Sequence, residues 1–227
     1  TDKTIFRTTS PRGNGVNQHA FYDFAANSIR WQIYYTEAGG TQRTTQFQLN
    51  GATQRLRGRW NHLVFTFESS STNYRHQWDA VLYINAVSMS WDGWPGTFAG
   101  GNQGTWGNAA NGPNEVNKIW LFNNSMGWKG GIDSVQNYNI KLSASAVRDL
   151  YNSRTAPTDA STLPSSSHCA SWWTMGDHGS DPTAVSGTVD NLTNGSFIYD
   201  MMGNNNLFVK QASNQGARMH WSRGIPQ

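Results

Sequence analysis

Runs of alternating apolar residues are the feature that most limits how this chain can fold. In "WNHLVFTFES", Leu63, Phe65 and Phe67 fall on one face of a strand. In "WDAVLYINAVSM", every second residue is again apolar, and Asn85-Ala86 follows where a tight turn is expected. Four more runs have this character: "SIRWQIYYTE", "TTQFQLN", "NEVNKIWLFNNS" and "SWWTMGD". Many short strands separated by Gly, Asn and Ser predict an all-β fold of the sandwich or jelly-roll kind.

One short helix is expected in this chain, at the end of "GGIDSVQNYNIKLSASAVRDLYNS". Ser143 is a favourable N-cap residue, and Leu142 and Val147 occupy the two positions of a hydrophobic staple. Val147, Leu150 and Tyr151 form one apolar stripe at helical spacing. A helix this short is stable only when it docks on other structure, so we expect it to be structural and to carry no chemistry.

The same patterns define the expected core. Its members are apolar residues on the inward faces of strands or on the helix stripe: Trp60, Leu63, Phe65, Leu82, Ile84, Ile119, Leu121, Ile132, Val135, Val147 and Leu150. Changing any of them to Ala is expected to lower the free energy of unfolding by about 2–5 kcal/mol.

Composition narrows the classes of function. Charged residues make up 14% of the chain, against about 25% in a typical globular protein. The 17 Lys and Arg are scattered and the formal net charge is +3, so we do not expect nucleic-acid binding. No apolar run approaches transmembrane length and no signal peptide is visible, so membrane insertion is not expected. The single cysteine, Cys169, excludes an internal disulfide.

Several segments together resemble the laminin-G-like, concanavalin A-like lectin-glucanase superfamily. They are "WNHLVFTF", "AVLYINAVSM", "KIWLFNN" and "WKGGIDSVQNYNIKLSASAVRDLYN". The family's motif positions fall on Trp60 with His62 and on residues 82–85, 131–135 and 142–151. The resemblance covers roughly residues 28–153 and implies a concanavalin A-like jelly roll of two curved sheets. Ala86 stands where the family has a turn glycine, which leaves open whether this hairpin closes with a two-residue type I′ turn.

The opening segment of such domains is missing at the N-terminus, and a similar segment follows the helix instead. It reads "HCASWWTMGDHGSDPTAVSGTVDNLTNGS". We therefore expect a laminin-G-like body over residues 1–153, a linker over 154–167, and a C-terminal segment over 168–227 that adds strands to the same sandwich and ends in an extended tail. The alternative is a truncated second repeat, which would leave Trp172 and Trp173 unburied at a cost in free energy.

A laminin-G-like body followed by a "WW-x-MGD" segment resembles structural proteins of tailed bacteriophages, especially marine phages. The resemblance implies a virion protein that is assembled in the host cytoplasm and released by lysis. Its implied partners are virion proteins such as the major capsid protein, and further copies of the same chain in a homo-oligomer. Low charge, Asn- and Gly-rich loops and the lack of disulfides agree with this origin.

Motifs for catalysis and metal binding are missing from the sequence. Polysaccharide hydrolases place two carboxylates close together, whereas none of Glu37, Glu68 and Glu115 has another acid within three positions. No G-x-S-x-G motif occurs, and the six His are dispersed. Asp177 and Asp181 form the closest acidic pair and, with nearby carbonyl oxygens, are candidate ligands for Ca²⁺. We therefore expect no enzymatic activity and no cofactor beyond a possible Ca²⁺.

Residues 90–115, "SWDGWPGTFAGGNQGTWGNAANGPNE", form the most distinctive stretch, which we call the tryptophan segment. Long loops in compact domains are more often functional than plain connectors. Tryptophan anchors protein interfaces, and it also stacks on sugar rings while Asn or Asp binds the hydroxyls. A third reading is that the segment folds back and covers one end of the sandwich. The candidate binding residues are Trp91, Asp92, Trp94, Asn102, Trp106 and Asn108.

Three functions follow from these observations. The first is a non-enzymatic structural or decoration module on the surface of a phage particle. The second is a lectin-like adhesion module that binds host-surface glycans, and the third is a polysaccharide hydrolase. The fold accommodates all three, so the assignment depends on the surfaces that the chain presents.

Overall fold

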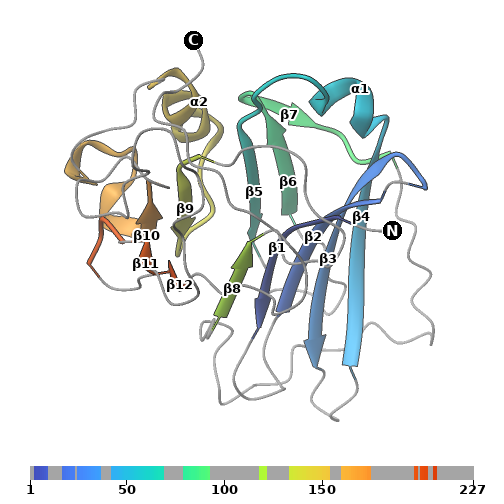
Figure 1. Ribbon diagram of the computed structural model, residues 1–227, viewed down its shortest axis with the longest axis horizontal. Coiled ribbons are helices and arrows are strands. Elements are labelled where there is room, and N and C mark those ends of the chain that lie inside the picture. The colour runs from blue at the N-terminus through green and yellow to red at the C-terminus, as the bar shows by residue number, and fades with distance from the viewer. Residues whose placement is uncertain are drawn as a thin grey trace, which may run out of the picture. The chain divides into compact units, whose positions relative to one another are not determined.

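The computed structural model describes residues 3–9, 17–23, 25–36, 42–68, 79–92, 118–121, 133–153, 160–174, 197–198, 200–203 and 207–208. These residues form mostly strands in antiparallel sheets, with few and short helices, so the predicted all-β class is confirmed (Figure 1). The chain divides into two compact units, and each unit is assembled from separate stretches of sequence. The first contains Thr1–Asn61, Phe67–Leu82 and Ser88–Trp128, and the second contains His62–Thr66, Tyr83–Val87 and Lys129–Gln227.

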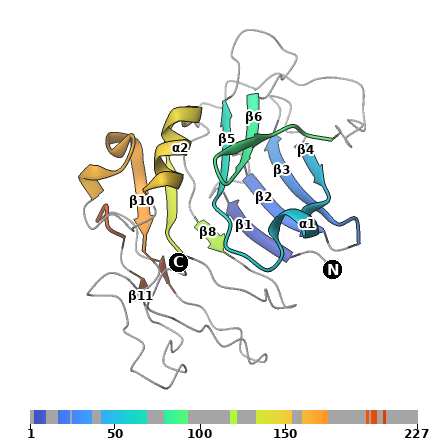
Figure 2. The ribbon, with the colours of Figure 1, turned by 90° about the horizontal axis from the view of Figure 1, so that it is seen from above.

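A five-stranded sheet forms the body of the first unit (Figure 2). Its order is β4-β3-β2-β1-β8, and its strands are β1 (Lys3–Thr9), β2 (Asn17–Asp23), β3 (Ser28–Thr36), β4 (Gln42–Asn50) and β8 (Lys118–Leu121). All neighbours in this sheet pair antiparallel. The β3/β4 register runs unbroken from Ser28 opposite Asn50 to Thr36 opposite Gln42. The β1/β2 register shifts between Thr4 and Phe6, which marks a bulge.

One face of this sheet is apolar and buried. Because side chains alternate along a strand, every second residue of β2, β3 and β4 points to this face. Its buried residues are Ala20, Ile29, Trp31, Phe47 and Leu49. Trp31 is 0% exposed, and its ring meets the edge of Phe67 at a centroid distance of 5.7 Å. Aromatic packing on this face therefore forms the core of the first unit.

A short helix, α1 (Ala52–Leu56), follows directly from β4 and is tied to the turn between β2 and β3. The backbone N–H of Ala52 donates to the carbonyl oxygen of Asn27 at 3.0 Å. The N–H of Thr53 donates to Asn27 Oδ1 at 2.8 Å, and the hydroxyls of Thr53 and Tyr22 are hydrogen-bonded. These bonds fix the start of α1 and so position the exposed residues that follow it.

A second sheet contains β5 (Leu63–Glu68), β6 (Asp79–Ile84) and β7 (Val87–Met89), in that order. The predicted inward face of β6 is confirmed at Ala80, Leu82 and Ile84, which are all buried. Asn85 and Ala86 close the β6–β7 turn with φ angles of 53° and 62°. Positive φ at both central residues is the requirement of a type I′ turn, so the hairpin adopts this form without a glycine.

The second unit is built around a strand pair and one helix. β9 (Val135–Tyr138) pairs antiparallel with β10 (Cys169–Trp173), and α2 (Ala144–Asn152) lies between them in sequence. Ser143 is confirmed as the N-cap of α2, because its Oγ accepts the N–H of Ala146 at 3.1 Å. Leu142 and Val147 are buried, as the hydrophobic staple predicts. The remaining elements are η1 (Ala160–Thr162), η2 (Ser166–His168), β11 (Phe197–Ile198) and β12 (Leu207–Phe208).

The strand expected in "SWWTMGD" forms as β10, and its tryptophans are buried. Trp172 is 0% exposed and Trp173 is 2% exposed. The indole N–H of Trp172 donates to Ser134 Oγ at 3.1 Å. Asp200 Oδ1 accepts the backbone N–H of Trp172 at 2.8 Å. Leu163, which falls inside the expected linker, is itself buried and packs with Cys169 and Trp172. The division of the chain into a body that ends at residue 153, a linker, and a C-terminal segment that begins at residue 168 stays a prediction.

The predicted core is correct in part. Leu82, Ile84 and Val147 are buried, whereas Leu63, Phe65, Val135 and Leu150 are half-buried. The side chains of Ile119, Leu121 and Ile132 lie outside the described residues. Trp60 is 47% exposed, so its assignment to the core is wrong. The reason is that β5 begins only at Leu63, which leaves Trp60 in the connection after α1 and outside the alternating pattern.

Candidate functional site

The structure describes only the first residues of the tryptophan segment, and there Trp91 packs against the buried face of the sheet. The Trp91 ring lies 5.3 Å from Phe47 and 6.4 Å from Trp31, measured between ring centroids. Its indole N–H donates to the carbonyl oxygen of Ala80 at 2.8 Å. This packing favours a structural role for Trp91. The other predicted binding tryptophans and amides, Trp94, Asn102, Trp106 and Asn108, lie outside the described residues.

Asp92 is exposed and binds the end of β4. Its backbone N–H donates to the carbonyl oxygen of Gln48 at 3.0 Å. Its carboxylate Oδ2 accepts the backbone N–H of Asn50 at 2.6 Å. β4 is the outer strand of its sheet in the described order. These bonds therefore give hydrogen-bond partners to backbone groups on the edge of the sheet. The tryptophan segment is therefore fixed to the sheet at two consecutive residues near its start, Trp91 and Asp92.

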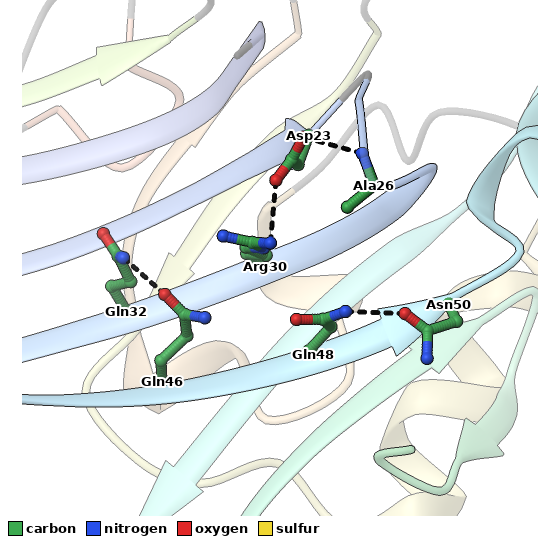
Figure 3. Close-up of polar contacts among 7 residues, drawn as sticks. All are labelled: Asp23, Ala26, Arg30, Gln32, Gln46, Gln48 and Asn50. Carbon is green, nitrogen blue, oxygen red and sulfur yellow. Dashed lines mark hydrogen bonds and ion pairs between the residues drawn. The ribbon is translucent and has the colours of Figure 1, made fainter. Parts of the chain in front are cut away.

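The second face of the five-stranded sheet carries polar side chains, drawn in Figure 3, together with the buried ring of Phe21. On β3 and β4 these residues alternate with the buried aromatic ones. Gln32 Nε2 donates to Gln46 Oε1 at 2.6 Å, and Gln48 Nε2 donates to Asn50 Oδ1 at 2.7 Å. The register sets four polar residues in one row across β1 to β4: Arg7, His19, Gln32 and Gln46. We call this surface the polar face.

An ion pair occupies one end of the polar face. Asp23 Oδ2 lies 2.9 Å from Arg30 Nη2, and Asp23 Oδ1 accepts the backbone N–H of Ala26 at 3.0 Å (Figure 3). The Asp23 side chain is only 12% exposed. This carboxylate is held by a guanidinium and a backbone amide at the same time. The polar groups drawn in Figure 3 are thus engaged with neighbouring residues of the sheet and its turn.

Two further reactive side chains, Cys169 and His62, lie in the second unit. Cys169 is buried, its Sγ donates to the carbonyl oxygen of Ser171 at 3.4 Å, and burial raises the pKa of its thiol. His62 stacks on Tyr151, and burial lowers the pKa of its imidazole. A thiol with a raised pKa is a weak nucleophile at neutral pH.

Metal ligands and membrane spans are likewise not found in the described part of the chain. Within it, no group of three or more His, Cys, Asp or Glu is arranged to hold a metal ion. The Ca²⁺ candidates Asp177 and Asp181 lie outside the described residues. Among the described helices, none is long and apolar enough to cross a membrane.

Sequence reasoning missed one exposed group of residues. It consists of Arg55, Arg57, Arg59 and Trp60, which are all exposed and which we call the arginine stretch, residues 55–60. The signal is visible in the sequence as "RLRGRW", with three arginines in five positions. The count over the whole chain does not reveal this local concentration, because most of the 17 Lys and Arg are dispersed.

Comparisons of the chain with protein-family profiles, with curated proteins and with solved structures found no match in any of the three. The resemblance to laminin-G-like domains and to phage structural proteins therefore stays a prediction. The candidate binding surfaces are the tryptophan segment and the arginine stretch.

Proposed function

We propose that this chain is a non-enzymatic structural or decoration module of a tailed-phage virion, folded as a concanavalin A-like jelly-roll sandwich. In this proposal the tryptophan segment contacts neighbouring virion proteins, such as the major capsid protein and other copies of the chain. The observation that supports it is the anchoring of the segment's first residues. Trp91 packs on Phe47, and Asp92 binds the backbone of Asn50. A loop with a fixed base loses less conformational entropy when it binds a partner.

The titratable groups of the described residues support a binding role over a catalytic one. Asp23 is engaged by Arg30 and by a backbone amide. Burial raises the pKa of the Cys169 thiol, which does not favour the nucleophilic thiolate, and it lowers the pKa of the His62 imidazole. Hydrolysis of a polysaccharide requires two acting carboxylates close to each other.

The proposal is tested by a double variant, Trp94→Ala with Trp106→Ala, in which Trp91 is retained. Trp91 must be kept, because its packing on Phe47 makes its loss destabilising for the first unit. We expect the double variant to fold, as judged by circular dichroism, and to be lost from assembled particles. Incorporation is measured by quantitative mass spectrometry of purified virions.

The matched control removes exposed apolar side chains elsewhere. Val87 and Ile140 are 59% and 40% exposed, and their replacement by Ala should leave incorporation unchanged. Normal assembly together with lost attachment to host cells or glycan arrays would instead establish the adhesion function. A double variant that both assembles and attaches normally would overturn both readings of the tryptophan segment.

A further inference from the structure

The arginine stretch places three guanidinium groups and one indole on the surface immediately after a short helix. Arg55 lies in the last turn of α1, and Arg57 is its C-cap residue. Arg55, Arg57 and Arg59 are exposed, and Trp60 is 47% exposed. Figure 1 shows α1 following β4 in the first unit. An exposed Trp beside several Arg is notable because these two residue types dominate the binding energy of protein interfaces.

Hydrogen bonds hold the arginine stretch in one conformation. Nε and Nη2 of Arg59 both donate to the carbonyl oxygen of Arg55, at 3.0 Å and 2.5 Å. Nδ2 of Asn61 donates to the carbonyl oxygens of Leu56 at 2.9 Å and of Arg59 at 3.1 Å. Arg55 Nη1 also contacts Met89 Sδ at 3.6 Å. A surface that is already ordered binds a partner with a smaller entropic penalty.

Among the described residues, no carboxylate neutralises the positive charge of the arginine stretch. The segment "GATQRLRGRWN", residues 51–61, contains no acidic residue. Within the described part of the chain, the three arginines make no ion pair. Guanidinium groups are weakly hydrated and match the geometry of carboxylates, with which they form paired hydrogen bonds. Charge complementarity therefore predicts that the arginine stretch binds an anionic partner.

We propose that the arginine stretch is a binding site for a carboxylate-rich segment of a partner protein. Arg55 and Arg57 bind carboxylates, Arg59 contributes the N–H groups that it does not donate to Arg55, and the Trp60 ring packs against apolar stems of the partner. This surface is separate in sequence from the tryptophan segment, so the inference does not depend on the virion assignment.

Two other partners fit the same charge less well. A second copy of the chain offers few carboxylates, because the whole sequence has 14 Asp and Glu and a net charge of +3. A nucleic acid is bound by a basic stripe that follows several phosphates. Here the charge is concentrated in five residues, and the rest of the 17 Lys and Arg are dispersed. An acidic protein segment is the partner that the observations favour.

The test uses the purified full chain and a fluorescent peptide of ten glutamates, with binding measured by anisotropy at low and at physiological salt. We expect salt-sensitive binding that the double variant Arg55→Ala with Arg57→Ala weakens about tenfold. The matched control is Arg148→Ala with Arg154→Ala, which removes two arginines elsewhere in the sequence and the same net charge. We expect this control to bind within about twofold of the natural chain, and Trp60→Ala to bind more weakly than the control.

Several outcomes would overturn the proposal. Equal losses in both double variants would mean that only net charge matters. Absence of binding at low salt would exclude an acidic partner. Tighter binding of a single-stranded oligonucleotide, abolished by the Arg55/Arg57 variant, would assign the site to nucleic acid. Circular dichroism and melting temperature verify that each variant folds. The further variant Arg55→Lys with Arg57→Lys keeps the positive charge but removes the paired hydrogen bonds that guanidinium groups form with carboxylates. None of these results depends on virion assembly, which tests the tryptophan segment separately.

Discussion

His62 shows how a single residue ties a strand to its neighbours in the second unit. Its ring stacks on Tyr151 with centroids 5.9 Å apart. Its backbone N–H donates to Asn85 Oδ1 at 2.9 Å, and its carbonyl oxygen accepts the N–H of Asn85 at 2.9 Å. In the described part of the chain, His62 Nδ1 has no hydrogen-bond partner. The groups that face it, Tyr151 and Asn85, are uncharged, whereas Arg148 and Asp149 of α2 are exposed. A positive charge on this ring would therefore have no negatively charged group facing it in the described part of the chain.

This environment predicts that the protein loses stability on acidification. Burial lowers the pKa of folded His62 below the ordinary value of 6.5, so the unfolded chain takes up a proton that the folded chain resists. The contribution of His62 to the free energy of unfolding is complete above pH 6.5 and decreases as the pH falls towards the folded pKa. The slope in that window is at most about 1.4 kcal/mol per pH unit. Urea denaturation between pH 7.5 and 5.5 measures it.

The control for this prediction is His62→Gln, which keeps a polar planar side chain but does not titrate in this range. The variant should show a flatter dependence of stability on pH than the natural chain. If the two slopes are the same, the loss of stability comes from other groups, and burial does not lower the pKa of His62.

At the scale of elements, the β6–β7 hairpin stores strain in its turn. Ala86 has a φ of 62°, in the left-handed region, where an L-residue with a Cβ is disfavoured by about 1–2 kcal/mol. Ala86→Gly removes this strain, although glycine increases the entropy of the unfolded chain. We expect a net gain in the free energy of unfolding of about 0.5–1 kcal/mol, measured by urea denaturation.

Two variants separate turn strain from a general effect of glycine. Ser88→Gly places the same residue in β7, outside the turn, and should destabilise the hairpin. Ala86→Val adds β-branching at positive φ and should destabilise it more strongly. A loss of stability in Ala86→Gly would show that the left-handed conformation of Ala86 is not strained.

The accuracy of the sequence-based predictions differs between elements for a physical reason. The inward face of β6 and the Ser143 cap of α2 depend on neighbouring residues, and both were predicted correctly. The pairing of β9 with β10 joins strands that are distant in sequence, and no local pattern specifies their register. Trp60 was misplaced because an isolated tryptophan in a connection has no periodicity to indicate its burial.

Prediction of the candidate site was limited in the same way. Composition and loop length identified the tryptophan segment, but they did not reveal that Trp91 packs on Phe47. The arginine stretch was present in the sequence as a local concentration of charge, yet its exposure depends on the ending of α1 at Leu56 and the late start of β5. The partners of Asp23 and Gln32 depend on strand register, which only the structure supplies.

At the scale of the whole molecule, stretches that are distant in sequence complete each compact unit. β6 and the turn after it are divided between the two units. Phe67–Leu82 belongs to the first unit and Tyr83–Val87 belongs to the second. In the second unit, β10 supplies the antiparallel partner of β9 and two fully buried tryptophans. Each large aromatic side chain buries about 150–250 Å², worth roughly 4–6 kcal/mol at about 25 cal/mol per Å². The second unit therefore depends on the C-terminal part of the chain.

This dependence predicts that a chain ending at Ser165 does not fold to a soluble monomer. The truncation removes β10, leaves the backbone groups of β9 unpaired, and deprives Leu163 of its packing against Cys169 and Trp172. A chain ending at Phe208 keeps β10, β11, β12 and the Asp200 contact to Trp172, and it should remain soluble. Size-exclusion chromatography and far-ultraviolet circular dichroism compare the two. A monodisperse, β-rich product from the shorter chain would mean that β10 is an addition to an already stable fold.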